Sequence, residues 1–516
     1  MSFVIAATLE HYCVSLAALF VASLFLVQYR KVRHLHLPPG PRPLPLIGNV
    51  LDVPNGFEWL TFMGWGRKFC SDIVHFKVFG ASTIVLNSQK AVHDLLEKKS
   101  NIYSSRPRWV MLNELMGWDW AFITMPYGKE WKARRKLFTN EFNPKHTERY
   151  EPQTLQAVHL FLLDLLREPD SFYRLLRHMA GSVVLSVTYG LTTKTAEVGD
   201  PFIDTAERAL DGFVAAAVPG SFWVDYLPIL KYIPSWFPGA SFQRKARAWR
   251  EDAEKMLNEP YDAVKSNIAK GVSRPCFVSY CLDNIRRSTE EEVDYQERLI
   301  KESASAMYEA ATDTSVTALH SFFLSMVCHP EVQRKAQEEI DNVVGSDRFP
   351  NFEDKGNLPY VCAVVNEVMR HQPVGPLGLP HLVTEEDEYK GYRIPKNSVV
   401  IANIWAILHD EATYGPHPNI FDPSRFLTED GSLNTAIPDP STSVFGFGRR
   451  ICPGRHLAVS TIFATIAYVL QCFEISALGI VTQEYESSIQ NRPVPFKCRI
   501  KPRSPQHENL IRSAAH

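Results

Sequence analysis

A single cysteine in a glycine-rich stretch is the residue of this sequence best suited to chemistry. Residues 445–458 read Phe-Gly-Phe-Gly-Arg-Arg-Ile-Cys-Pro-Gly-Arg-His-Leu-Ala, and the apolar run over 457–470 predicts a helix that starts at Pro453. Three glycines allow positive φ angles and a close approach to a flat ligand: Gly446, Gly448 and Gly454. Cys452 is therefore expected near a helix N-terminus, where unpaired N–H groups favour a thiolate. Such a thiolate is a metal ligand or a nucleophile; the alternative is a buried structural cysteine.

A second candidate lies inside a long helical pattern. Residues 297–328 place apolar or small side chains at helical spacing, and Asp313 stands there between Thr312 and Thr314. Asp and Thr compete with a helix for its backbone hydrogen bonds, so this cluster is locally unfavourable. The residues leave open whether Asp313 lies on the solvated face, as most charged residues do, or has a functional role.

Two further spacings place polar side chains on one helix face. Trp131 and Arg135 are four residues apart and share a face. They belong either to an amphipathic surface helix or to a site for a buried anionic ligand, which would need such donors. Glu367 and Arg370, three residues apart, would contribute little as a surface pair.

Five residues around the cysteine match FxxGxRxCxG, the haem-binding pattern of the cytochrome P-450 family: Phe445, Gly448, Arg450, Cys452 and Gly454. The sequence is similar to this family over essentially its whole length, with four motifs in the family's order. It most resembles fungal membrane-bound members of secondary metabolism. The resemblance implies a haem b (heme b) group whose iron takes the Cys452 thiolate as its axial ligand.

The resemblance also implies roles for the other candidates. Phe445 belongs to the haem-binding pattern, and Asp313 with Thr314 would relay protons to the distal oxygen. Ala311 stands where the family usually has glycine, which narrows the space above the haem. Four residues would neutralise the haem propionates: Trp131, Arg135, His381 and Arg450.

By the same resemblance, Glu367 and Arg370 would join Arg425 from a later loop in a structural triad that fixes the cysteine loop. The segments 374–379 and 487–491 would touch substrate. Two apolar segments keep two interpretations each. Residues 109–122 form core or a pocket lid, and residues 222–228 form ordinary packing or a pocket roof that dips into a membrane surface.

The composition is that of a globular protein. Of the 516 residues, 45% are hydrophobic, and the formal net charge of −2 argues against nucleic acid as a partner. The sequence has nine cysteines with no CxxC pair, which indicates a reducing compartment without a disulfide framework.

The N-terminal residues predict membrane attachment. Residues 12–27 are almost wholly apolar, and Arg30, Lys31 and Arg33 follow them, so the charge stands on the wrong side for a cleaved signal peptide. We expect a single-pass anchor over 1–29, a basic and proline-rich hinge over 30–48, and a haem-thiolate catalytic domain over 49–516. The catalytic domain is expected on the cytoplasmic side of the endoplasmic reticulum membrane.

The expected fold is mainly α with a smaller β region: a single large cytochrome P-450 domain after a transmembrane helix. Residues 72–78 and 82–87 predict an antiparallel strand pair, and short strands are expected over 392–394 and 399–401.

The expected function is insertion of one oxygen atom into a C–H bond of a small apolar secondary metabolite. A terpenoid is expected, and an indole or polyketide stays open. A haem-thiolate isomerase or dehydratase that does not use O₂ is the alternative enzyme. No GxGxxG dinucleotide site is present, so electrons are expected from a separate NADPH-dependent reductase that docks on a monomer. Basic residues on the cysteine side would receive it: Lys129, Lys132, Arg134, Arg449 and Arg455.

Overall fold

The computed structural model describes residues 35–513 except 219 and 286–288. The longer helices are α2 (Glu58–Lys68), α5 (Lys129–Glu141), α7 (Glu151–Arg167), α8 (Phe172–Tyr189), α9 (Pro201–Ala217), α11 (Ser241–Ala269), α12 (Phe277–Ile285), α13 (Glu290–Cys328), α14 (Pro330–Val343), α15 (Pro359–His371), α19 (Arg455–Cys472) and α20 (Pro505–Ser513). The strands are β1 (Ile73–Val78), β2 (Ala81–Leu86), β3 (His381–Leu382), β4 (Asp387–Tyr389), β5 (Tyr392–Ile394), β6 (Val399–Ala402), β7 (Phe473–Ala477), β8 (Tyr485–Ser487), β9 (Asn491–Pro493) and β10 (Cys498–Pro502).

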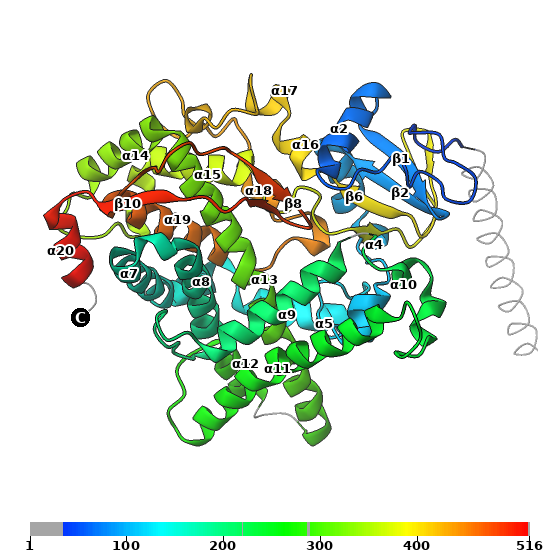
Figure 1. Cartoon of the computed structure of the whole chain (residues 1–516), viewed down its shortest axis with the longest axis horizontal. Coiled ribbons are helices and arrows are strands. Elements are labelled where there is room, and N and C mark those ends of the chain that lie inside the picture. The colour runs from blue at the N-terminus through cyan, green and yellow to red at the C-terminus, as the bar shows by residue number, and fades with distance from the viewer. Residues whose placement is uncertain (1–34, 219, 286–288, 514–516) are drawn as a thin grey trace, which may run out of the picture.

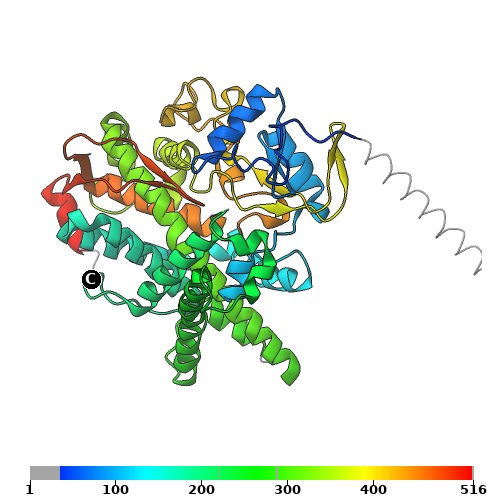
Figure 2. The ribbon, with the colours of Figure 1, turned by 45° about the vertical axis from the view of Figure 1, so that its right-hand side comes forward.

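Short α-helical turns connect these elements: α3 (Gln89–Val92), α4 (Ser100–Tyr103), α6 (Pro144–Thr147), α10 (Trp223–Tyr226), α16 (Ile404–Leu408), α17 (Glu411–Tyr414) and α18 (Ser441–Val444). Tighter or wider helical turns do the same: η1 (His93–Lys98), η2 (Val110–Leu115), η3 (Glu148–Tyr150), η4 (Pro169–Ser171), η5 (Pro228–Tyr232), η6 (Glu353–Asn357), η7 (Pro423–Phe426) and η8 (Gly448–Arg450). The chain is therefore mainly helical with a smaller strand region, as predicted. The strands β1, β2 and β6 gather at one end, and most helices lie in the remaining part together with the red C-terminal strands (Figures 1 and 2).

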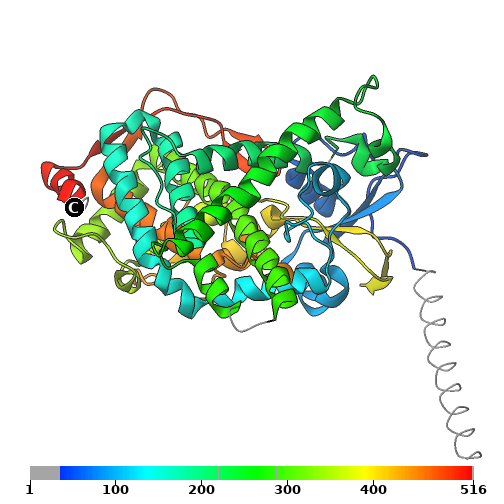
Figure 3. The same cartoon turned by 90° about the horizontal axis from the view of Figure 1, so that it is seen from below.

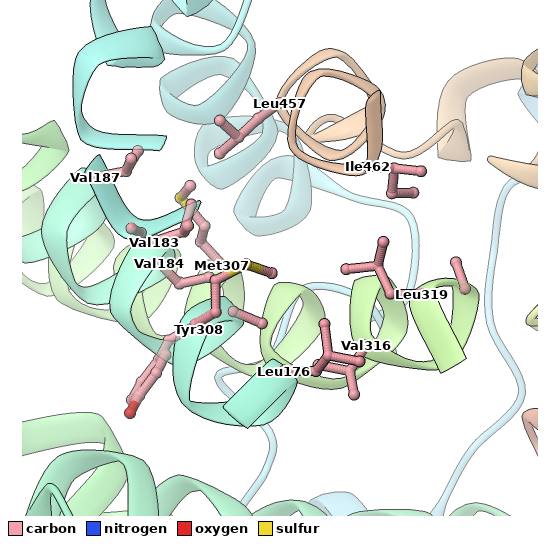
Figure 4. Packing of buried hydrophobic residues seen from close by; sticks show 14 of the residues in the cluster. Leu176, Val183, Val184, Val187, Met307, Tyr308, Val316, Leu319, Leu457 and Ile462 are labelled. Carbon is pink, nitrogen blue, oxygen red and sulfur yellow. The ribbon is translucent and has the colours of Figure 1, made fainter. Parts of the chain in front are cut away.

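Helix α13 is the element around which the other helices pack. It contacts α8, α19, α5 and α15, and its middle is buried on almost every face. Met307, Val316 and Leu319 of α13 lie among apolar side chains of α8 and α19 (Figure 4). Viewed from below, green helices cross the middle of the molecule, away from the blue and yellow strands (Figure 3). The sequence predicted that this helix begins near residue 297, but it begins at Glu290. Its acidic first turn suits a helix N-terminus, and a search for apolar periodicity does not register it.

The predicted hairpin forms and is part of a four-stranded sheet. β1 pairs antiparallel with β2, and β2 pairs in parallel with β6, which also pairs with β3. Phe79 and Gly80 both have positive φ, 47° and 84°, as a two-residue type I′ turn requires. The sheet brings β3, which starts at His381, next to segments from the first quarter of the chain.

The two apolar segments with open interpretations have mixed roles. Most of residues 109–122 is core: Trp118 is fully buried, and its ring centroid is 5.0 Å from that of Phe213. Phe122, at the end of this segment, lines the cavity described below. In residues 222–228, Val224 is buried whereas 61% of Trp223 is exposed.

The predicted anchor over 1–29 and the first part of the hinge lie outside the described residues. Within residues 35–513, excluding 219 and 286–288, no helix is both long and apolar enough to span a membrane.

Candidate active site

The loop that carries Cys452 depends on two glycines. Gly446 and Gly448 have φ angles of 76° and 58°, which L side chains rarely adopt. A Cβ atom on Gly448 would also lie 2.1 Å from the backbone oxygen of Leu96, so no larger residue fits. The loop closes through a hydrogen bond of 2.7 Å from the Cys452 N–H to the carbonyl oxygen of Phe445.

Two expectations about this loop are wrong. Gly454 has a φ of −86°, so it does not use the positive region. It is the N-cap of α19, which begins at Arg455, and Pro453 therefore precedes the helix and does not occupy its first position. A residue without a side chain is therefore needed upstream of the cysteine, where the loop contacts the chain near Leu96.

Burial opposes the thiolate that the sequence predicts at Cys452. It raises the pKa of the Cys452 thiol, and a hydrogen bond from the Gly454 N–H and the charges of Arg135 and Arg455 offset only part of this effect. In the protein without a bound metal, burial therefore favours the neutral thiol. A metal ion bound to the sulfur would supply the missing positive charge, since a coordinating thiol is deprotonated outright.

Cys452 faces a cavity of about 380 Å³ between α13, α9 and the segment after α15. Ala310 and Thr314 of α13 line the cavity, and so does the segment 374–379 through Val374, Leu377 and other residues. Ile489 and Gln490 from the C-terminal loop complete one side. The predicted substrate segments thus border the cavity that contains the cysteine.

Three arginines, the buried Arg106 and the half-buried Arg135 and Arg450, meet at one end of this cavity and are called the arginine cluster below. Arg450 donates to the carbonyl oxygens of Ser104 and Met125 at 2.7 and 2.6 Å, and its guanidinium lies 4.5 Å from the Trp131 ring centroid.

Within the part of the chain that the structure describes, no carboxylate pairs with this cluster. Burial lowers the pKa of Arg450 to about 8, that of Arg106 to about 9 and that of Arg135 to about 10. Unpaired buried cations are costly, so this end of the cavity calls for an anionic ligand.

The other predicted propionate contacts lie in the same place. Trp131 and His381 line the cavity beside the arginine cluster. His381 is buried, its Nδ1 lies 2.7 Å from the carbonyl oxygen of Tyr103, and burial holds its pKa well below the usual range. His381 is therefore a neutral hydrogen-bonding group, and the positive charge comes from the arginines.

Sequence reasoning missed Arg106. It donates to the carbonyl oxygens of Leu379 and Pro380 at 2.7 Å and reaches the cavity from the loop after α4. Its only local signal is the adjacent Pro107, and its position depends on contacts with distant segments.

On the opposite wall, α13 presents Thr314 and Asp313 to the cavity. The Thr314 hydroxyl donates to the carbonyl oxygen of Ala310 at 2.9 Å. Asp313 is partly buried and forms an ion pair with Arg492 of β9. The proton-relay role of Asp313 and Thr314 stays a prediction, and so does the narrowing by Ala311, which also lines the cavity.

The predicted triad of Glu367, Arg370 and Arg425 forms. Glu367 and Arg370 are 0% exposed and 2.6 Å apart, and Arg425 Nε donates to Glu367 Oε1 at 3.2 Å. Arg370 also donates to the carbonyl oxygen of Leu408 at 2.9 Å. None of these three residues lines the cavity. The role of the triad is therefore to hold the surrounding loops together.

One of the five proposed reductase contacts is wrong. The Arg134 side chain is 3% exposed. Its Nε donates to Glu302 Oε2 at 2.8 Å, and its Nη1 donates to Glu130 Oε2 at 2.9 Å. A side chain committed to two carboxylates inside the protein is not available to a partner. Lys129, Lys132 and Arg449 are exposed, and Arg455 is half-buried.

These features fit a haem. The thiol of Cys452 faces the same cavity as the arginine cluster, whose charges match the propionates, and the glycine loop leaves room for a flat ligand. Cys452 would hold the iron, while the cluster, Trp131 and His381 would hold the propionates.

Comparison with known proteins agrees with this assignment. The family model described as Cytochrome P450 matches residues 38–498. The chain is 44% identical to Cytochrome P450 monooxygenase 98 of Postia placenta over 95% of both chains. It is 43% identical to Cytochrome P450 monooxygenase ple1 of Rhodocybe pseudopiperita, over 94% of this chain and 92% of that one. It is 39% identical to Tryptamine 4-monooxygenase of Psilocybe cyanescens, over 92% and 94%. The predicted family, cofactor and enzyme class are confirmed: the chain belongs to the cytochrome P450 family of haem-thiolate monooxygenases.

Proposed function

We propose that this protein hydroxylates a small, largely apolar secondary metabolite with a terpenoid skeleton. The supporting observation is the cavity wall opposite Cys452, which is apolar over most of its area. Its side chains come from α8, α9, α13 and the segment after α15: Val184, Leu210, Phe213, Val214, Ala306, Ala310 and Leu377. These apolar side chains suit a hydrocarbon body and position it by shape.

The chain's own residues divide the remaining work. When bound, the haem supplies the activation of dioxygen. The Thr314 hydroxyl, which both donates and accepts, lies on the cavity wall and would pass a proton onward, and Asp313 next to it would resupply that proton. Protons would arrive through these two groups.

Electrons would come from an NADPH-dependent reductase. Four basic residues near the cysteine loop supply a positive surface for it: Lys129, Lys132, Arg449 and Arg455. Charged rim residues of this kind steer encounter with an acidic partner, and their effect weakens as salt rises.

An indole amine is the second candidate substrate. The observation in its favour is the 39% identity to Tryptamine 4-monooxygenase of Psilocybe cyanescens. Aromatic Phe213 and Phe122 in the cavity wall would pack against an indole ring as readily as against a terpene.

We also propose that the protein is monomeric and lies at the endoplasmic reticulum membrane, with residues 1–29 as its anchor. Large apolar side chains around α10 and η5 are exposed and would rest against lipid: Trp223, Leu227, Ile229, Tyr232, Trp236 and Phe237.

The decisive experiment combines the full chain, haem, a reductase and NADPH with matched terpene, indole and polyketide ligands. Incorporation of ¹⁸O from ¹⁸O₂ into a terpene product supports the proposal. Oxidation of the indole amine alone would replace the terpenoid assignment. Product formed without O₂ would instead indicate the isomerase or dehydratase alternative. The red-shifted band of the reduced, CO-bound protein first verifies that sulfur-ligated haem is loaded.

A further inference from the structure

A carboxylic acid in the cavity wall has no role in the chemistry described so far. Glu309 of α13 lines the cavity, and this residue is only 5% exposed. Its Oε2 atom is buried and has no hydrogen-bond partner. Among the residues that the structure describes, Glu309 forms no ion pair.

The charged groups near Glu309 have other partners. Asp313, one helical turn after Glu309, pairs with Arg492. The arginine cluster and His381 would meet the haem propionates. The other side chains that line this wall near α9 are apolar, among them Leu210 and Phe213. Glu309 is thus a buried acid without a partner for Oε2, on a part of the wall where the side chains of α9 are apolar.

An unpaired buried acid costs free energy, and an apolar side chain of similar size would remove that cost. A group of this kind at a binding site is explained when a ligand completes its hydrogen bonds.

We infer that Glu309 is a substrate-binding residue that hydrogen-bonds a hydroxyl or carbonyl oxygen on an otherwise apolar substrate. This inference rests on the proposed function and adds a polar anchor to the apolar skeleton. The anchor would fix which carbon of the skeleton faces Cys452, because one hydrogen bond at a set point on α13 removes most of the rotational freedom that a smooth wall allows.

A neutral oxygen fits better than an ammonium group. Burial raises the pKa of Glu309 to about 8, so the acid is mostly protonated at neutral pH and can donate one hydrogen bond while accepting another. An ammonium group would need an ionised partner and further acceptors, and the neighbouring carboxylate of Asp313 is held by Arg492.

The chemistry places this protein after an oxygen-introducing step. The substrate class requires an earlier oxidation of the skeleton, or a cyclisation that ends by adding water, to supply the hydroxyl or carbonyl group. The proposed hydroxylation would then be the second step that adds an oxygen atom to the same molecule.

The test measures ligand binding by the change in the haem absorption band of the loaded, full-length protein. The ligands are a terpene hydrocarbon, its alcohol, its ketone and its primary amine on one skeleton. The variants are Glu309→Gln, which keeps a neutral hydrogen-bonding group, and Glu309→Leu, which removes it. Glu297→Gln and Glu297→Leu make the same changes on α13 outside the cavity and serve as controls.

The wild-type protein should bind the alcohol or ketone about 10-fold more tightly than the hydrocarbon, the size expected of one buried hydrogen bond. Glu309→Leu should abolish this preference, and Glu309→Gln should keep most of it. Glu309→Leu should also raise the unfolding temperature of the ligand-free protein, because an unpaired buried acid is removed.

Unchanged ligand preference in Glu309→Leu would overturn the inference. Tightest binding of the amine, lost in both Glu309 variants, would overturn the neutral-oxygen class. The proposed function fails separately: a protein that binds these ligands but inserts no oxygen into any of them loses the hydroxylation assignment while the binding result for Glu309 stands.

Discussion

The carboxylate of Asp313 on α13 is held by the guanidinium of Arg492 on β9, a strand near the C-terminus. Arg492 Nε also donates to Gln490 Oε1 at 3.1 Å, and Thr317 Oγ1 lies 3.0 Å from the same oxygen. The C-terminal hairpin is thereby connected to the helix turn that carries Thr314. Asp313 is neither a free surface charge nor a free cavity acid, and its side-chain position is set by Arg492.

Replacing Arg492 by Gln should disturb proton supply and stability together. A partly buried carboxylate loses its partner, so the free energy of unfolding should fall by about 1–3 kcal/mol. Product formed per NADPH should fall several-fold while peroxide rises, because Asp313 no longer has a fixed position. Product and peroxide formed per NADPH are measured in quenched assays. The free energy of unfolding is measured by chemical denaturation. Arg499→Gln, at an exposed arginine on β10, the next strand in the sequence, should change neither.

Thr314→Ala should divert reduced oxygen to peroxide. The hydroxyl is placed on the cavity wall, and its loss should lower product per NADPH by about 10²-fold at most, with NADPH consumption continuing. Thr312→Ala is the matched control. Its hydroxyl donates to the carbonyl oxygen of Tyr308 at 2.7 Å, and it does not line the cavity. Equal coupling in Thr314→Ala and the wild type would remove Thr314 from proton delivery.

Gly448→Ala should prevent haem incorporation. The alanine methyl would meet the Leu96 oxygen at 2.1 Å in a backbone conformation with φ at 58°, so the cysteine loop must shift. Purified variant protein should lack the absorption band of sulfur-ligated haem after reduction and CO addition. Gly64→Ala in α2, where no atom lies within 4 Å of the new methyl group, should load haem normally. A Gly448→Ala protein with full haem content would show that the loop tolerates a side chain.

His371 should make the protein sensitive to acid. Burial and the adjacent Arg370 lower the pKa of His371 to about 4, and its Nε2 lies 3.0 Å from the carbonyl oxygen of Asn419. The folded state keeps this histidine neutral, whereas the unfolded chain takes up a proton below about pH 6.5. The contribution of the neutral His371 to the free energy of unfolding is therefore complete above about pH 6.5. It is lost as the pH falls toward 4, by about 1.4 kcal/mol per pH unit.

Unfolding free energies measured between pH 7 and 4 check this expectation. His371→Gln should reduce the slope of stability against pH by as much as one proton. A part of the slope should remain, because burial also lowers the pKa of His75 to about 4. Identical slopes for His371→Gln and the wild type would show that His371 does not titrate on unfolding.

Local sequence determined the elements and the identity of the reactive group. The apolar spacing of α13 and the three-residue spacing that puts Glu367 and Arg370 on one helix turn act through neighbouring residues, so both can be read without the fold. The β1–β2 hairpin belongs to the same class, because its turn conformation depends on Phe79 and Gly80 alone.

Only the tertiary structure decided the burial and the partners of the ionisable groups. Arg106 reaches the cavity through carbonyl groups of Leu379 and Pro380, and Arg134, expected at the surface, is buried against Glu302. Burial also made Glu309 an unpaired acid and opposed ionisation of Cys452. The physical reason is common to all four: the state of a charged group depends on its distance to water and to opposite charges, and residues far apart in the chain set both distances.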